Sequence, residues 1–158
     1  MTKIPLTRIA AEQEKAEALR AAVRSVRLPE EGPRKLADLE DTRRFYDFIR
    51  DPSVSEPIYT LPKPITPAST RAFIERHMEE QLRGEGLLML EIGARDRVAG
   101  YHDFQFWPEW SACEVGGAIN RELQSMGVGG GGTRPSSYWE IGKAAWRAVR
   151  NENAETSG

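Results

Sequence analysis

Residues 113–132 read CEVGGAINRELQSMGVGGGG, and this stretch decides how the rest of the chain is interpreted. Its apolar first part, residues 113–119, predicts a strand, which a polar turn at 120–123 ends. Glycine then occupies five of the six positions from 127 to 132. Because glycine has no Cβ, its backbone N–H groups stay accessible, and a helix that followed would add those of its first turn. The stretch therefore predicts a strand that leads into a binding site for phosphate oxygens.

The composition is that of one globular domain, with 158 residues, of which 39% are hydrophobic and 29% charged. A net charge of −2 favours neither a nucleic-acid partner nor a membrane surface, and we expect neither. A single cysteine, Cys113, excludes an internal disulfide and is typical of a reducing compartment. The N-terminus is charged and lacks a signal-peptide core, and no apolar run reaches the roughly 20 residues of a membrane span. These features predict a cytoplasmic protein.

Local signals predict two of the helices that precede the glycine-rich stretch. Ala, Glu, Lys, Leu and Arg dominate residues 10–24, which predicts a helix that either packs on the domain or mediates dimerisation. Thr66, followed by proline, indicates the N-cap of a second helix over 68–82, which Gly84 ends. His77 lies on or beside the apolar stripe of this helix, where it is either a structural or surface residue or a catalytic one. The positions expected to face inward are Phe73, Ile74, His77, Met78 and Leu82.

The rest of the pattern predicts a sheet built as a meander. A loop with four prolines, residues 53–67, either lines a binding site or is a rigid connector. The alternating and apolar runs between turn residues predict antiparallel strands joined by hairpins. The expected elements are a short strand at 26–28, a helix at 35–50, and strands at 87–92, 97–107 and 113–119.

Several interpretations of the glycine loop compete. Residues 127–132 match G-x-G-x-x-G, but a run with five glycines matches many patterns, and the preceding strands are antiparallel rather than part of a βαβ unit. A phosphate loop of the Walker type would end in Gly-Lys-Ser/Thr, which this chain lacks there. A flexible glycine linker is a further alternative. The last interpretation begins earlier, because Gln124-x-x-Gly127-x-Gly129 has a recognisable spacing.

That spacing resembles the Gln/Arg-x-x-Gly-x-Gly/Ala loop of the GNAT superfamily of N-acetyltransferases. The strand and turn over 114–123 are similar to those that precede the loop in this family, and the strand Val98-Ala99-Gly100-Tyr101 is similar to its V-x-G strand. Residues 36–52 and 72–76 resemble the first two helices of the ribosomal-protein-alanine N-acetyltransferase branch. The resemblance covers about residues 26–130.

The resemblance implies an α/β (α+β) fold with a mixed, mostly antiparallel sheet flanked by helices and splayed where acetyl-CoA enters. The main chain of Ile119 would bind the pantetheine arm. Glu114 would be the general base that deprotonates the amine, although a sheet-face carboxylate with an ion-pair partner is the alternative. Cys113 is either an acyl-carrying nucleophile or a buried strand cysteine. No metal site is expected. The N–H groups that would hold the pyrophosphate are those of Gln124, Ser125, Met126, Gly127, Val128, Gly129 and Gly130.

Beyond the glycine loop the chain departs from the family pattern, so the C-terminal half of the sheet is expected to be incomplete. The expected division is an N-terminal helical extension at 1–25, an acetyl-CoA-binding domain at 26–135 and a divergent C-terminal helix and tail at 136–158. Trp139 and Trp146 would share one face of that helix. The predicted function is transfer of an acetyl group from acetyl-CoA to an amine, either a protein N-terminus or a small molecule. The alternative is an inactive GNAT-like CoA-binding or assembly protein, and a homodimer is possible in either case.

Overall fold

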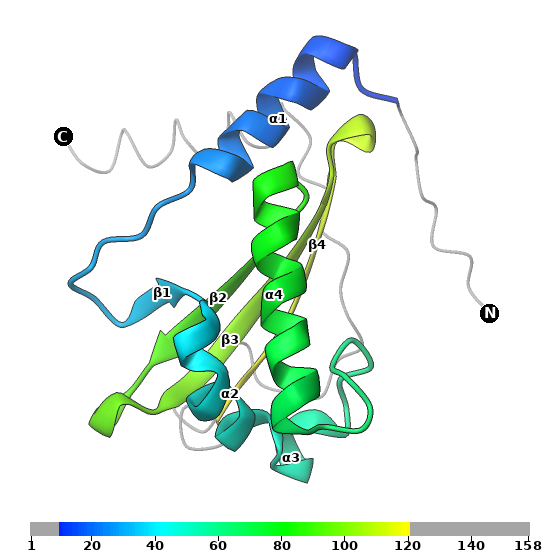
Figure 1. Cartoon of the computed structure of the whole chain (residues 1–158). Helices are drawn as coiled ribbons and strands as arrows, with labels where there is room; N and C mark the ends of the chain where they lie inside the picture. Colours follow the sequence, from blue (N-terminus) through cyan, green and yellow to red (C-terminus); the bar gives the residue numbers. More distant parts are fainter. Residues whose placement is uncertain (1–9, 121–158) are drawn as a thin grey trace, which may run out of the picture.

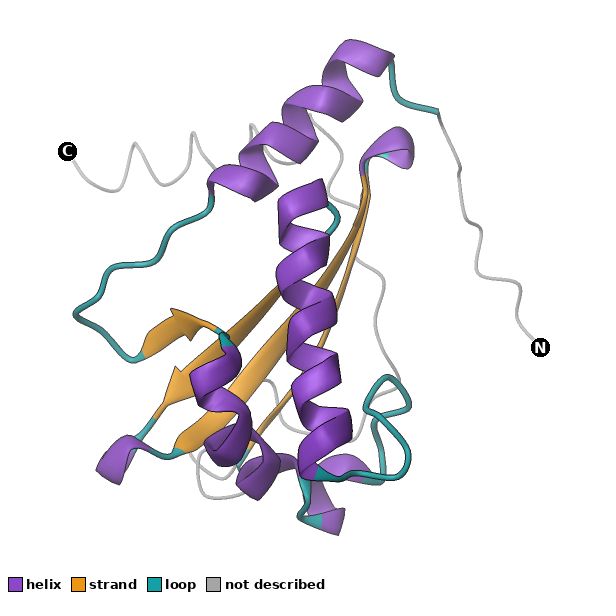
Figure 2. Cartoon of the chain, viewed as in Figure 1, coloured by secondary structure: helices purple, strands orange, loops and turns teal. Residues whose placement is uncertain are grey.

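The computed structural model describes residues 10–120, which form a mixed α+β structure. A four-stranded antiparallel sheet with strand order β1-β2-β3-β4 carries helices on one face (Figure 1, Figure 2). The helices are α1 (Gln13–Ser25), α2 (Thr42–Ile49), α3 (Pro52–Ser55) and α4 (Pro67–Arg83), and the strands are β1 (Arg34–Leu36), β2 (Gly86–Ile92), β3 (Val98–Trp107) and β4 (Ala112–Ile119). Short 3-10 helices occur at η1 (Leu39–Asp41), η2 (Ala94–Asp96) and η3 (Pro108–Trp110). The predicted meander of three antiparallel strands is confirmed.

Helix α4 follows its local sequence signals closely. Thr66 and Ser69 form a capping box at its start, with proline at the first position, and Gly84 ends it at φ 79°. A side chain at Gly84 would also place its Cβ 2.6 Å from the backbone of Arg20 in α1, so glycine is required there twice over. The boundaries predicted from the sequence are therefore confirmed.

The buried stripe of α4 is narrower than expected. Thr70, Phe73, Ile74 and His77 are buried, with spacings of three and four residues. Met78 and Leu82 were expected to face inward, but they are 38% and 76% exposed. Met78 lies one residue and Leu82 five residues beyond His77, and at about 100° per residue both positions are rotated away from the buried stripe toward solvent.

The core lies between the helices and the sheet. Phe45 and Ile49 of α2 are fully buried together with Leu90 of β2 and Tyr101 of β3. The rings of Phe45 and Tyr101 pack edge to face, with centroids 5.2 Å apart. The register places Leu88 opposite Asp103 and Leu90 opposite Tyr101 on the helix-facing side of the sheet. A bulge between Glu91 and Ile92 then shifts the alternation, so that Val98, opposite Ile92, also reaches the core.

The N-terminal part of the predicted fold needs two corrections. The short strand expected at 26–28 is wrong, since β1 is formed by Arg34–Leu36 instead. The helix expected from residue 35 begins later, because Lys35 pairs with Leu90 in the sheet and Asp38 acts as the N-cap of η1. The loss of those first residues to the sheet shortens the helix to α2.

Helix α1 confirms the helix predicted at 10–24 and is docked on the rest of the structure. It crosses the C-terminal end of α4 and reaches η3 (Figure 1). The backbone N–H of Ala11 donates to the carbonyl of Glu109 at 2.7 Å, and Arg20 pairs with the Glu109 carboxylate at 2.9 Å. These contacts support the packed alternative for α1 over a role reserved for dimerisation.

Candidate functional site

Strand β4 forms one edge of the sheet described by residues 10–120. Within these residues it pairs only with β3, while β1 forms the opposite edge. The N–H of Asn120 donates to the carbonyl of Ala99 at 2.8 Å. With the register of the two strands, this bond shows that the even-numbered residues of β4 direct their backbone groups toward β3. Because the direction of backbone groups alternates along an antiparallel strand, those of Val115 and Gly117 point away from β3. Ile119, the predicted pantetheine-binding position, follows in the same phase.

Gly117 holds the backbone of β4 close to β3 just before this edge reaches Ile119. Its φ is +151°, and a Cβ there would lie 2.2 Å from the carbonyl oxygen of Tyr101. Both the dihedral angle and the contact exclude a side chain. The path of the strand at this point therefore depends on glycine.

Glu114, the predicted base, lies on the helix-facing side of β4 opposite Gln105. The hydroxyl of Tyr59 donates to its Oε1 at 3.0 Å, across 55 residues of sequence. Within residues 10–120 this phenol, rather than a basic side chain, contacts the carboxylate. The contact is a different one from the ion pair considered as the alternative, and it leaves the second carboxylate oxygen for another partner.

The proline-rich loop between α3 and α4 brings Tyr59 to this position. Leu61 is buried in the core at 3% exposure, and Ile58 and Ile65 pack against the same core. Tyr59 between these anchors remains 72% exposed. Its role could not be foreseen from spacing, because only the fold brings residue 59 to residue 114.

Cys113 lies on the opposite side of β4, across from Phe106. Burial, and then the charge of Glu114, raise the pKa of its thiol to about 11. The thiolate is the nucleophilic form, and it is scarce at neutral pH when the pKa is this high. The structure therefore favours the structural interpretation of Cys113 over the acyl-carrying one.

A buried polar cluster lies between α4 and β3. His77 contacts Asp103 through Nε2 and Oδ1 at 2.9 Å, and Gln105 donates to Asp103 at 3.3 Å and to Glu80 at 3.0 Å. The structural interpretation of His77 is supported, but its partner was missed. The signal was present, since Asp103 shares the strand phase of the buried Tyr101 and therefore faces the helices.

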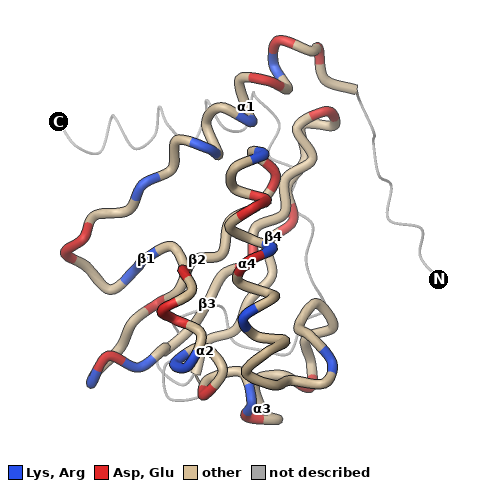
Figure 3. Tube along the Cα trace, viewed as in Figure 1, with Lys and Arg blue, Asp and Glu red and all other residues tan. Residues whose placement is uncertain are grey.

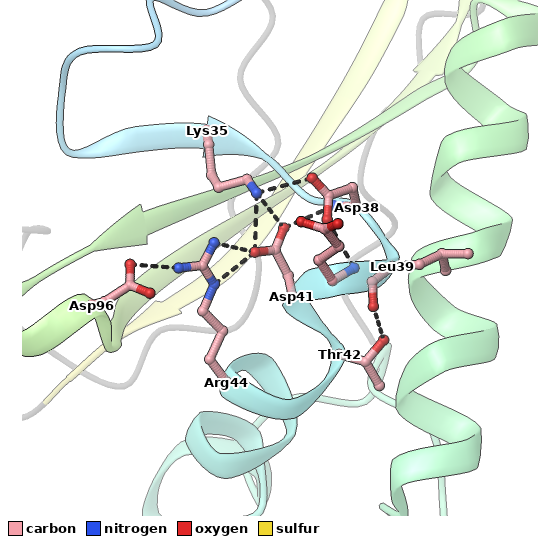
Figure 4. Close-up of polar contacts among 8 residues, drawn as sticks. Lys35, Asp38, Leu39, Asp41, Thr42, Arg44 and Asp96 are labelled. Carbon is pink, nitrogen blue, oxygen red and sulfur yellow. Dashed lines mark hydrogen bonds and ion pairs between the residues drawn. The ribbon is translucent and has the colours of Figure 1, made fainter.

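A second polar cluster joins β1, η1 and α2 to the β2–β3 turn (Figure 4). Lys35 and Arg44 both pair with the fully buried Asp41, and Arg44 also reaches Asp96 at 2.6 Å. A hollow of about 500 Å³ lies beside these cations. Because each of the two cations is already matched by carboxylates, the cluster is built as a structural junction rather than as an anion site.

Charge elsewhere is evenly mixed, with acidic and basic residues interspersed along α1 and α4 (Figure 3). Within residues 10–120, no three His, Cys, Asp or Glu side chains gather closely enough to hold a metal ion. In that part of the chain, none of the helices has the length and apolar character needed to cross a membrane. The predicted pyrophosphate-binding residues, Gln124 to Gly130, and the predicted tail helix lie outside the described residues.

Neither a scan against protein-family models nor a search of curated proteins finds a match to this chain.

Proposed function

We propose that the protein is a GNAT-like acyltransferase that moves an acetyl group from acetyl-CoA to an amine, either a protein N-terminus or a small molecule. The observation that carries the proposal is the geometry of β4. Its outward backbone groups border an edge, its helix-facing side holds Glu114, and the chain continues from it directly into the glycine loop. In the sequence, the candidate base, the outward-facing positions and the glycine loop follow one another, and this order suits a base, an extended cofactor arm and a pyrophosphate.

The backbone and side-chain groups of β4 are of the types that would bind acetyl-CoA and deprotonate an amine. The outward backbone groups of Gly117 suit the amides of a pantetheine arm, which would add to the sheet like a further strand. Glu114 would accept the proton of the incoming ammonium, since only the neutral amine attacks a carbonyl carbon. The thioester supplies the activated acyl group. Tyr59 would hold one carboxylate oxygen and leave the other for the amine.

The cofactor is tested first, by calorimetric titration of the full chain with coenzyme A. We expect binding by the natural protein and none by Gly129→Val, because a Cβ at 129 would block the approach of phosphate to the backbone. Gly132→Val is the matched control, since it alters a glycine beyond the Gln-x-x-Gly-x-Gly spacing. Equal affinity in all three proteins would contradict the proposed loop.

The base is tested by Glu114→Gln, which keeps the shape of the side chain but removes its charge. We expect a loss of acetylation rate of about 10²-fold or more, a flattened acid limb of the pH–rate profile and unchanged coenzyme A affinity. Glu109→Gln is the matched control, because Glu109 lies in η3 and pairs with Arg20 instead. Unchanged turnover in Glu114→Gln would make Glu114 a structural residue.

The second candidate is a catalytically inactive assembly protein, and the edge of β4 favours it as well. Val115 is 45% exposed on the sheet face that the described helices leave uncovered, where Phe104 is its partner across the strands. Such an edge tends to recruit another chain. We propose a homodimer in this case, in which residues 136–158 pack across the neighbour. Light scattering at micromolar concentration would contradict it by giving a monomeric mass.

A further inference from the structure

The face of the sheet turned away from helices α1 to α4, which we call the open face, is apolar (Figure 2). The register places Leu87, Phe104 and Val115 next to one another across β2, β3 and β4 on this face. The rings of Phe104 and Phe106 are stacked along β3, with centroids 6.2 Å apart. The apolar side chains on which the argument depends are Leu87, Met89, Phe104, Phe106, Cys113 and Val115.

This pattern is that of a covered surface rather than a solvated one. An antiparallel sheet with one face in water normally carries polar residues at the outward positions of its strands. Here Val115 is 45% exposed and Phe104 and Phe106 are half-buried. Contiguous apolar surface of this kind marks a contact site. The open face is therefore built to receive an apolar partner.

The charge of the open face excludes a nucleic-acid partner for the stacked rings. Aromatic side chains can stack on bases, but such surfaces also carry cations for the phosphates. Among the four described strands, the open face carries one cation of this kind, Arg34, and it pairs with Glu91 at 3.2 Å. A partner without a strong negative charge is thus favoured.

Residues 138–150 of the same chain have the pattern of such a partner. At about 100° per residue, the four charged residues of this segment would fall within an arc of about 80° on a helix. Trp139 and Trp146 lie outside that arc, on a side that is otherwise made of Ala, Gly, Ile, Tyr and Val. A helix of this kind buries its apolar side against another apolar surface. The four charged residues are Glu140, Lys143, Arg147 and Arg150.

We infer that residues 138–150 dock as a helix on the open face of the sheet of their own chain. The 17 residues from 121 to 137 join this segment to β4 and could span up to about 55 Å when extended. Strand β3, with 10 residues, is about 33 Å long, so the segment can reach any part of the face. The inference does not depend on acetyl transfer, because Glu114 lies on the other side of β4.

The length of the connection favours the chain's own sheet over that of a second copy. A short flexible linker gives an effective concentration on the order of mM, well above a micromolar concentration of free protein. Five glycines between residues 127 and 132 make this linker flexible. This arrangement within one chain differs from the exchange between neighbours in the inactive candidate, and concentration dependence separates the two.

Cys113 provides a natural probe, because the chain's single cysteine lies on the open face. The test measures its rate of alkylation by iodoacetamide in the full chain, at one pH for all proteins because the pKa of the thiol is raised to about 11. We expect the double variant Trp139→Ser, Trp146→Ser to raise this rate about tenfold or more, since loss of docking uncovers the thiol. The double variant Glu140→Ser, Arg147→Ser is the matched control, with the same spacing of seven residues and no change in net charge.

Two results of this measurement would overturn the inference. Equal rates in the tryptophan variant and its control would mean that the segment does not cover Cys113. A rate in the natural protein that falls as the protein concentration rises would assign the cover to a second copy. The inference requires a slow rate that is the same at every concentration.

Cross-linking keeps both tryptophans in place and so does not depend on how the tryptophan variant folds. A short bis-maleimide is used on Ala145→Cys and, as the matched control, on Lys143→Cys, whose position would lie about 160° away around the helix. We expect Ala145→Cys to cross-link to Cys113 within one chain in clearly higher yield, measured by mass spectrometry of the monomeric product. Equal yields, or products formed mainly between chains, would overturn the inference.

Discussion

Asp41 and Asp103 are both buried carboxylates on the helix side of the sheet, but their partners differ in kind. Asp41 is fully buried against Lys35 and Arg44, and it also accepts the N–H of Asp38 at 2.8 Å (Figure 4). Asp103 faces one imidazole and one amide. One junction is held by two cations that keep their charge across the neutral range, and the other by an imidazole ring and an uncharged amide.

The difference indicates how each region responds to its surroundings. Burial lowers the pKa of Lys35 by itself, but its contacts with Asp38 and Asp41 outweigh this and raise the pKa overall. The β1–α2 junction is therefore charged at any pH where the carboxylates are ionised. At the α4–β3 contact, Asp103 lies instead against a ring nitrogen of His77 and the amide of Gln105. The sheet is thus joined to α2 by two cations that share one buried carboxylate, and to α4 by contacts of one buried carboxylate with a ring nitrogen and an amide.

The largest expected effect comes from breaking the junction at Asp41. Asp41→Ala leaves Lys35 and Arg44 partly buried without their shared carboxylate and removes the capping contact of η1. We expect a loss of about 3–5 kcal/mol in the free energy of unfolding, measured by urea denaturation. Asp47→Ala is the matched control, because Asp47 pairs with Arg43 on the surface of α2, and screening by solvent should keep its loss below about 1 kcal/mol. Similar losses in the two variants would contradict the role of Asp41.

A smaller effect concerns the pH dependence of the β1–α2 junction. Burial raises the pKa of Asp38, but the hydrogen bond from Lys35 and those from the backbone outweigh it and lower the pKa overall. A lowered pKa means that this stability is present above the unfolded pKa of about 3.9 and is lost as the pH falls through the folded value. We therefore expect the β1–α2 junction to weaken in acid.

The measurement compares urea midpoints of the natural protein and Lys35→Met from neutral pH down to about pH 3, near the ordinary pKa of aspartate. Lys35→Met should be less stable at neutral pH and should lose less on acidification, because the carboxyl of Asp38 no longer gains from the lysine. Lys63→Met, in the α3–α4 loop, is the matched control. An acid dependence in Lys35→Met as steep as in the control would refute the assignment.

The parts of the fold that could be predicted are those set by neighbours in sequence. Thr66 and Gly84 fixed the ends of α4 because caps act over a few residues. Lys35 was placed in a helix because its strand partner, Leu90, is remote in the sequence. The same limit applies to the candidate site: Glu114 could be placed on its strand, but Tyr59 reaches it only through the folded loop.

The smallest expected effect comes from removing only the hydroxyl of Tyr101, which lies two residues before Asp103 on β3. The hydroxyl of Tyr101 is buried and, among the described residues, makes no hydrogen bond, and burial followed by the charge of Asp103 raises its pKa. An unsatisfied buried hydroxyl costs stability, whereas the ring packs on Phe45 and Phe48. We expect Tyr101→Phe to keep the stability or to raise it by about 1 kcal/mol, and Tyr101→Ala to lose about 3–5 kcal/mol, by urea denaturation. A loss above about 1 kcal/mol in Tyr101→Phe would mean that the hydroxyl has a partner that matters, and the α4–β3 contact would then include a third polar group.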